Sequence, residues 1–187
     1  MPELLDAAAR LFARSGYAAT SMRDIATEVK MLPGSLYYHF ASKEELLLAV
    51  YRAGVQELHI ATSEALESET EPWARLEALC KAHLETVLRD SDYAHVLIRV
   101  LPDDVPQAAD QLRELRERYE EVFRKVVAQL PLPQNSDRRM LRLMLIGALN
   151  WAPLWFNPQG RDSPRALAKT FVGILKEPDG GKKRGSA

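Results

Sequence analysis

The stretch that decides the fold reads Pro33-Gly34-Ser35-Leu36-Tyr37-Tyr38-His39-Phe40 and continues as Ala41-Ser42-Lys43-Glu44-Glu45-Leu46. Pro33 suits the first position of a helix, because the N–H that proline lacks would have no partner there. Leu36 and Phe40 lie four residues apart and therefore share one face of a helix of about two turns. Tyr38 and His39 are left on the opposite face, so this short helix presents polar atoms that need a partner outside the chain.

Two further helices are predicted ahead of this one. Between residues 2 and 15, apolar side chains recur at the spacing of one helix face, and Gly16 provides a C-terminal stop. Ser21 followed three residues later by Asp24 is a variant of the capping box, so a second helix should run from there to about Val29. Two helices joined by a tight turn, the second of them short and polar on its free face, form a helix-turn-helix.

The rest of the chain also has helical periodicity. Ser42 to Glu45 reads as a full capping box that opens a long helix at about residues 43–68. More helices are expected at about 73–89, 91–101, 106–130, 136–156 and 163–176. No sustained strand-like alternation is present, so the predicted fold class is all-α with about nine helices. The predicted parts are a helix-turn-helix DNA-binding domain at 1–48, an effector-binding and dimerisation domain at 49–176 and a disordered tail at 177–187.

The composition is that of a soluble globular chain, with 47% hydrophobic and 27% charged residues among 187. A single cysteine, Cys80, excludes an internal disulfide framework and fits a reducing cytoplasm. Met1 to Asp6 has no basic segment before an apolar run, so we do not expect a secretory signal. The longest apolar run, at 143–156, is interrupted by Gly, Asn and Pro and is too short to span a membrane.

Catalytic and metal-binding patterns are absent from the sequence. It has no glycine-rich loop after a strand and no serine elbow, and its four histidines are scattered rather than grouped at ligand spacing. We therefore expect no enzyme, no metal site and no cofactor.

The helix-turn-helix carries a specific motif, Ala9-x-Leu11-Phe12-x-x-x-Gly16-Tyr17-x-x-Thr20-Ser21-Met22-x-Asp24-Ile25-Ala26, which is followed by the stretch from Gly34 to Leu46 quoted above. Over about residues 3–51 this motif resembles the DNA-binding domain of the TetR/AcrR family of bacterial repressors. The remainder of the chain is similar to that family in the number and length of its helices.

This resemblance implies which residues contact double-stranded DNA. In the family, the positions that face the major groove correspond to Arg23, Pro33, Gly34, Ser35, Tyr38 and His39, and those that hold the DNA backbone correspond to Ser21, Tyr37 and Lys43. The physical reason is that outward side chains near the start of a recognition helix reach base edges. An isolated tyrosine usually packs in a core, but here Leu36 and Phe40 already occupy the buried face.

Charge contributes little to the predicted DNA binding. The first 50 residues contain five Lys and Arg against six Asp and Glu, and the whole chain has a net charge of −1. Many relatives carry a basic arm ahead of the first helix, which this sequence lacks unless an upstream segment is missing. Few basic residues neutralise few phosphates, so dimerisation should supply much of the affinity for a palindromic operator.

The resemblance also implies a twofold homodimer and an effector pocket in the second domain. The predicted dimer interface consists of Leu141, Leu145, Ala148, Leu149, Ala152, Phe171, Val172 and Leu175; the alternative is that these residues are ordinary core. The predicted effector pocket consists of Trp73, Cys80, His83, Tyr93, Leu97, Val100, Tyr119, Phe123, Met144 and Trp151.

The run from Asn150 to Gly160 resembles the C-terminal region of TetR-type regulators that control fatty-acid or steroid breakdown and sense acyl-CoA thioesters. It implies an acyl-CoA or related lipid metabolite as effector, with Arg99, Arg142 and Arg161 as candidate partners of CoA phosphates. The expected function is a cytoplasmic repressor. Its effector would shift the helix at 43–68 and so release the operator.

Two alternatives stay open. One keeps the DNA-binding domain but makes the protein an activator, or a redox sensor that is triggered through Cys80. The other is a helical ligand-binding or hydrolytic protein whose helix-turn-helix is vestigial, which the weak basic charge would fit.

Overall fold

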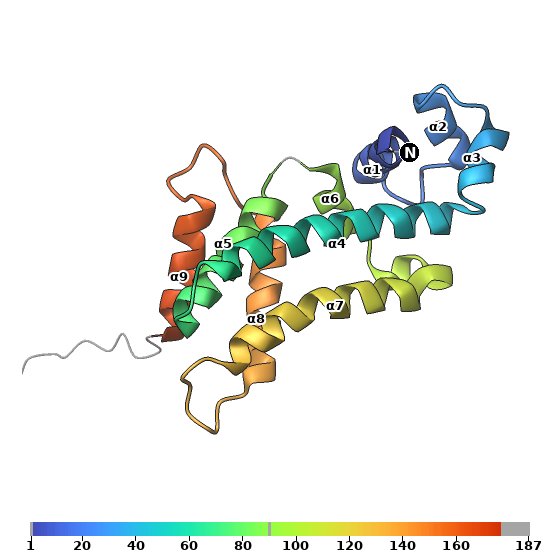
Figure 1. Cartoon of the computed structure of the whole chain (residues 1–187). Coiled ribbons are helices and arrows are strands. Elements are labelled where there is room, and N and C mark those ends of the chain that lie inside the picture. The colour runs from blue at the N-terminus through green and yellow to red at the C-terminus, as the bar shows by residue number, and fades with distance from the viewer. Residues whose placement is uncertain (1, 90, 177–187) are drawn as a thin grey trace, which may run out of the picture.

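The computed structural model describes residues 2–89 and 91–176, and every regular element in these ranges is helical (Figure 1). The α-helices are α1 (Pro2–Ser15), α2 (Met22–Glu28), α3 (Pro33–His39), α4 (Lys43–Glu67), α5 (Pro72–Val87), α6 (Asp92–Arg99), α7 (Ala109–Ala128), α8 (Arg138–Trp151) and α9 (Pro164–Lys176). Short 3-10 turns lie at Pro102–Asp104, Pro106–Ala108 and Ala152–Leu154. The predicted all-α class is confirmed, with nine α-helices in the described ranges. The tail predicted at 177–187 lies outside them.

Helices α1, α2 and α3 form a small unit at one end of α4 (Figure 1, blue). Its core contains Phe12 and Leu36, which are almost completely buried. The capping box predicted at Ser21 is confirmed, because its hydroxyl accepts from the N–H of Asp24 and the Asp24 carboxylate accepts from the N–H of Ser21. The chain leaves α2 through Lys30, whose φ of 55° is left-handed and closes the helix before α3 begins.

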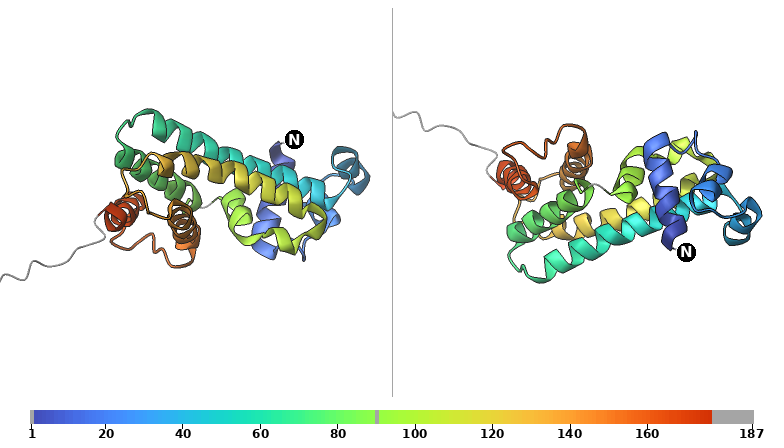
Figure 2. Two further views of the ribbon diagram at one scale, coloured as in Figure 1. Left: turned by 90° about the horizontal axis from the view of Figure 1, so that it is seen from below. Right: turned by 90° about the horizontal axis from the view of Figure 1, so that it is seen from above.

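The long helix α4 runs from the helix-turn-helix through the body of the molecule (Figures 1 and 2). The domain boundary predicted after residue 48 therefore falls inside one continuous helix. Its cap differs from the predicted box in one bond. The Ser42 hydroxyl accepts from the N–H of Glu45 at 3.1 Å, but the Glu45 carboxylate accepts from the N–H of Ala41 at 2.9 Å. Because α4 is unbroken, a rotation of the portion of α4 within the body of the molecule also moves the helix-turn-helix.

The body is packed around α5, which contacts α4, α6, α7, α8 and α9. Its leucines Leu76, Leu79 and Leu84 are fully buried, as are Leu112 of α7 and Leu149 of α8. Figure 2 shows α7 lying along α4, while α8 and α9 stand together at the other side of α5. Among the described residues, no helix is both long and apolar enough to cross a lipid bilayer.

Helix α6 lies between the helix-turn-helix and the body, because it packs against both α1 and α4. Gly54 of α4 permits this close approach: a β-carbon there would lie 3.1 Å from side-chain carbons of Leu97 and 3.3 Å from the carbonyl oxygen of Tyr93. Two polar contacts also tie α6 to α1. The Tyr93 hydroxyl donates to Asp6 at 2.7 Å, and Arg99 donates to a carbonyl near the C-terminal end of α1 at 3.1 Å.

Candidate DNA-binding surface and effector cavity

The outward face of α3 is exposed, and the side chains of Tyr37, Tyr38 and His39 make no hydrogen bond to any described residue. Tyr38 is 87% exposed and Tyr37 is 52% exposed, whereas Leu36 is fully buried. The His39 ring lies edge-on to Tyr38, with the ring centroids 5.5 Å apart. Residues 33–35 are exposed at the start of the same helix. The phenol and imidazole groups are of the kinds that meet base edges and phosphates.

Ser21 and Arg23 are exposed at the start of α2, which packs against α3. The Ser21 hydroxyl donates to the Asp24 carboxylate at 2.7 Å. This bond, together with the one from the Ser21 backbone, lowers the pKa of the Asp24 carboxyl. The hydroxyl is therefore engaged in the helix cap, while Arg23 forms no ion pair within the described part of the chain. Their contacts with DNA stay predictions.

Lys43 has an internal role that the sequence motif did not indicate. Its ammonium group donates to the carbonyl oxygens of Tyr17 and Thr20, both at 3.0 Å, and lies 4.1 Å from the centre of the Tyr17 ring. The Tyr17 hydroxyl in turn donates to Glu44 at 2.9 Å. Burial and this carboxylate raise the pKa of Tyr17. Lys43 thus joins the turn between α1 and α2 to the start of α4, which leaves one N–H for a phosphate.

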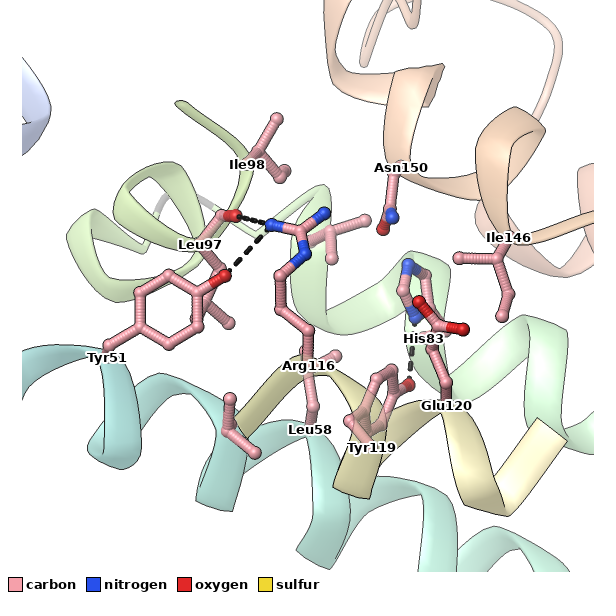
Figure 3. Close-up of a pocket in the computed structure, with 12 residues that line it drawn as sticks. Tyr51, Leu58, His83, Leu97, Ile98, Arg116, Tyr119, Glu120, Ile146 and Asn150 are labelled. Carbon is pink, nitrogen blue, oxygen red and sulfur yellow. Dashed lines mark hydrogen bonds between the residues drawn. The ribbon is translucent and has the colours of Figure 1, made fainter. Parts of the chain in front are cut away.

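A cavity lies where α4, α5, α6, α7 and α8 meet (Figure 3). Its volume is about 50 Å³, which is room for a few water molecules. The cavity is lined by Tyr51, Val55, Leu58, His83, Val87, Leu97, Ile98, Arg116, Tyr119, Glu120, Ile146 and Asn150. The structure therefore brings together three residues of the predicted effector pocket, His83, Leu97 and Tyr119.

Three more predicted pocket residues lie in the core rather than on the wall of this cavity. Cys80 and Trp73 are buried in α5, and the Phe123 ring packs against His83 with 5.8 Å between ring centroids. Burial raises the pKa of the Cys80 thiol. A redox-sensing cysteine needs access and a lowered pKa, so these surroundings argue against Cys80 as a trigger.

The remaining four predicted pocket residues do not line this cavity and face other surroundings. Tyr93 faces α1, and Val100 lines a separate hollow at the C-terminal end of α1. Met144 and Trp151 are 57% and 65% exposed on the outer side of α8. The error has a physical cause: α8 is apolar on two faces, and periodicity alone does not tell which of them turns inward.

Sequence reasoning missed four polar residues of the cavity, Tyr51, Arg116, Glu120 and Asn150. The Arg116 guanidinium donates to the Tyr51 hydroxyl at 2.9 Å and to the Leu97 carbonyl at 3.4 Å, so it links α7 to α4 and α6 (Figure 3). Arg116 lies in a charge-rich run, residues 113–118, and such a run usually forms the solvated outer face of a helix. Its position three residues before Tyr119 could have placed it on the inner face.

His83 and Tyr119 form a buried pair in the cavity wall. His83 Nδ1 lies 2.8 Å from the Tyr119 hydroxyl, and the two rings are stacked. Burial lowers the pKa of His83 to about 4 and raises the pKa of Tyr119. Both side chains are therefore neutral at physiological pH.

The predicted dimer residues divide into two groups. Leu145, Leu149, Ala152 and Val172 are buried within the single chain, as the alternative of ordinary core would have them. Leu141, Ala148, Phe171 and Leu175 are partly exposed. The exposed apolar side chains of this region are instead Met140, Leu143, Met144, Trp151, Leu154, Trp155 and Ile174, which the prediction did not assign to the interface.

The part of the chain that the structure describes contains no group of three or more His, Cys, Asp or Glu side chains arranged to hold a metal ion.

The two parts of the chain each match a known protein family. Residues 4–50 match the family described as "Bacterial regulatory proteins, tetR family", and residues 69–177 match "Tetracyclin repressor-like, C-terminal domain". The chain belongs to the TetR family. The resemblance seen in the helix-turn-helix motif is thereby confirmed, and it extends over the second domain.

Two TetR-family relatives are similar over most of their length. The chain is 36% identical to the HTH-type transcriptional repressor KstR2 of Mycobacterium tuberculosis (strain H37Rv) over 183 residues, 92% of this chain and 89% of that one. It is 28% identical to the HTH-type transcriptional activator FasR of Mycolicibacterium smegmatis over 165 residues, 86% of this chain and 75% of that one. This TetR-family chain is thus a transcriptional regulator and not an enzyme.

Among solved structures of the same fold is AibR in complex with isovaleryl coenzyme A and operator DNA. It superposes with a TM-score of 0.78 at 24% identity and covers 91% of this chain and 95% of that one. A TetR-family regulator from Bordetella parapertussis 12822 also has a TM-score of 0.78, at 28% identity over 98% of this chain and 96% of that one.

Proposed function

We propose that this TetR-family chain is a homodimeric repressor that acts in the cytoplasm and leaves a palindromic operator when an acyl thioester of coenzyme A enters the cavity. The observation that carries the proposal is the exposed face of α3. Tyr38 is 87% exposed, although a large aromatic side chain is normally at least partly covered. A surface of this kind at the end of a helix-turn-helix fits a DNA major groove.

The effector class is supported by what similar proteins bind and by the chemistry of the cavity. The AibR complex contains isovaleryl coenzyme A. Most side chains around the cavity of this chain are aliphatic or aromatic, which suits an acyl group. A volume of about 50 Å³ is too small for the whole ligand. Binding would therefore require the surrounding helices to separate, and that movement is the signal.

The route of this signal runs through α6 as well as α4. Leu97 and Ile98 of α6 line the cavity, and α6 is also tied to α1 by Tyr93 and Arg99. An effector that displaces α6 would push on α1 while α4 moves with the body. The two recognition helices of a dimer must be about 34 Å apart to enter successive major grooves. A change in that separation would release the operator.

The proposal is tested by fluorescence anisotropy with labelled DNA from beside the gene. We expect wild-type protein to bind this DNA and to release it on addition of isovaleryl coenzyme A. Tyr38→Ala should weaken binding by about 1–3 kcal/mol, the range for a good base contact, without changing the melting temperature. Ile60→Ala, which removes an exposed side chain of α4, is the matched control. Equal binding by wild type and Tyr38→Ala would disprove the assignment of α3.

Activation of transcription is the second candidate, because FasR is named as an activator. A reporter gene behind the bound DNA separates the two. Deletion of the regulator should raise expression if the chain is a repressor and lower it if the chain is an activator.

A further inference from the structure

One ring nitrogen at the effector cavity has no partner. His83 is 1% exposed, and its Nε2 atom makes no hydrogen bond to any described residue. Figure 3 shows this nitrogen facing the Asn150 side chain of α8, on the far side of the ring from Tyr119. Asn150 raises the pKa of His83 against the larger effect of burial, but Nε2 has no partner within hydrogen-bond geometry among the described residues. A buried polar atom without a partner is costly, so Nε2 marks a point where a ligand atom would be stabilised.

The hydrogen-bond partners determine whether Nε2 carries a proton. The Tyr119 hydroxyl is buried, and Nδ1 of His83 is its partner at 2.8 Å. If Tyr119 donates to Nδ1, the imidazole proton lies on Nε2 and one donor is left unpaired. If Nδ1 donates to Tyr119, both the phenol proton and the Nε2 lone pair are left unpaired. The first arrangement leaves one buried polar atom without a partner and the second leaves two, so the first is favoured. Nε2 then offers an N–H to the cavity.

The charges around the cavity favour an uncharged ligand atom at this N–H. Glu120 lines the same cavity, and no described Lys or Arg lies close enough to form an ion pair with it. Arg116 supplies a positive charge, but the partners of its guanidinium are the uncharged Tyr51 hydroxyl and Leu97 carbonyl. One negative and one positive group leave the cavity nearly neutral overall. A free carboxylate would therefore gain little at the neutral imidazole, because the attraction of Arg116 is offset by the repulsion of Glu120.

The rest of the wall defines the body of the ligand. Val55, Leu58, Val87 and Ile146 are aliphatic and line the cavity together with Leu97. We propose that the Nε2–H of His83 donates to the carbonyl oxygen of an acyl thioester, whose short or branched aliphatic chain packs on these side chains. This inference rests on the proposed function and deepens it, because it names the group of the effector that is recognised and the residue that recognises it.

The experiment compares two ligands that differ in one oxygen atom. Isovaleryl coenzyme A contains the thioester carbonyl, and its thioether analogue carries a CH₂ group in place of that C=O. Isothermal titration calorimetry with wild-type protein should give about tenfold tighter binding of the thioester, the value of one hydrogen bond. His83→Phe should bind both ligands with equal affinity. His59→Phe, which changes an exposed histidine of α4 outside the cavity, should keep the tenfold preference.

A second measurement covers the case in which His83→Phe does not fold. The ¹⁵N NMR spectrum of histidine-labelled wild-type protein should show His83 with its proton on Nε2, and this resonance should move on addition of the thioester more than on addition of the thioether.

The outcomes of these experiments test the role of His83 separately from the proposed effector class. Equal binding of the two ligands by wild type, or a proton on Nδ1, overturns the role of His83 but leaves the acyl-CoA effector in place. If isovaleryl, acetyl, hexanoyl and octanoyl coenzyme A all fail to bind a protein that still binds its operator, the proposed effector class falls, and the inference falls with it.

Discussion

Lys43 is the residue whose surroundings differ most from what the family motif implies. Its ammonium group donates to the carbonyl oxygens of Tyr17 and Thr20, and hydrogen bonds to charged groups each contribute about 1.5–3 kcal/mol. Lys43→Met should therefore lower the free energy of unfolding by about 2 kcal/mol in urea denaturation as well as weaken operator binding. Lys30→Met, at an exposed lysine, is the control. If Lys43→Met weakens operator binding but leaves the free energy of unfolding unchanged, Lys43 acts only as a phosphate contact.

His83 should make stability depend on pH. Burial lowers its pKa to about 4 from 6.5, so below pH 6.5 the unfolded chain takes up a proton that the folded chain does not. Stability is then full above pH 6.5 and is lost as the pH falls toward 4, by up to about 3 kcal/mol. Chemical denaturation of wild type and His83→Asn across this range measures the difference. If the free energy of unfolding changes with pH in the same way for both proteins, the assigned pKa of His83 is contradicted.

At the scale of residues, the sequence predicts positions on a helix better than partners across helices. The spacing of Leu36 and Phe40 correctly placed Tyr38 on the exposed side, because one helix determines that geometry. Lys43 bonds to carbonyl oxygens of the turn between α1 and α2, and Arg116 bonds to a carbonyl oxygen of α6. No local pattern encodes which carbonyl will lie within reach.

At the scale of elements, α6 has the contacts needed to couple the cavity to the helix-turn-helix. Arg116 holds α6 through the Leu97 carbonyl. Arg116→Met should bind the operator with normal affinity, but effector-induced release should require about tenfold more ligand, which corresponds to a coupling loss of about 1.4 kcal/mol. Anisotropy titrations of the protein–DNA complex with isovaleryl coenzyme A measure this shift. Arg113→Met, which removes exposed ion pairs to Asp103 and Asp110, should release as wild type does.

The extent of each helix was largely predictable, while its orientation was not. Prolines and caps determined the starts of α3, α5 and α9, because both signals act within the local chain. The last helix turn predicted beyond Trp151 is instead a 3-10 turn, since Pro153 cannot continue the hydrogen-bonding pattern. For α8 the inward face depends on how α5 and α7 pack against it, which the sequence of α8 alone does not contain.

At the scale of the whole molecule, an apolar stripe on the outer side of α8 and α9 should form the dimer interface. Met140, Leu143, Met144 and Trp151 lie at helical spacing and are all exposed, as is Ile174. Exposed apolar clusters of this kind mark interaction surfaces.

A charge within this stripe should separate the protomers. Met144→Glu should give a monomer in sedimentation velocity and should lose most operator affinity, because one short recognition helix makes too few contacts alone. Ile60→Glu places the same charge on an exposed position of α4 and should stay dimeric. If the Met144→Glu protein remains dimeric, the dimer interface lies elsewhere on the molecule.

The size of the cavity also has a consequence for the speed of the response. A cavity of about 50 Å³ is too small for the proposed acyl effector, so entry of this ligand would require the helices to separate. The observed association rate should then level off at high effector concentration, at the rate of opening.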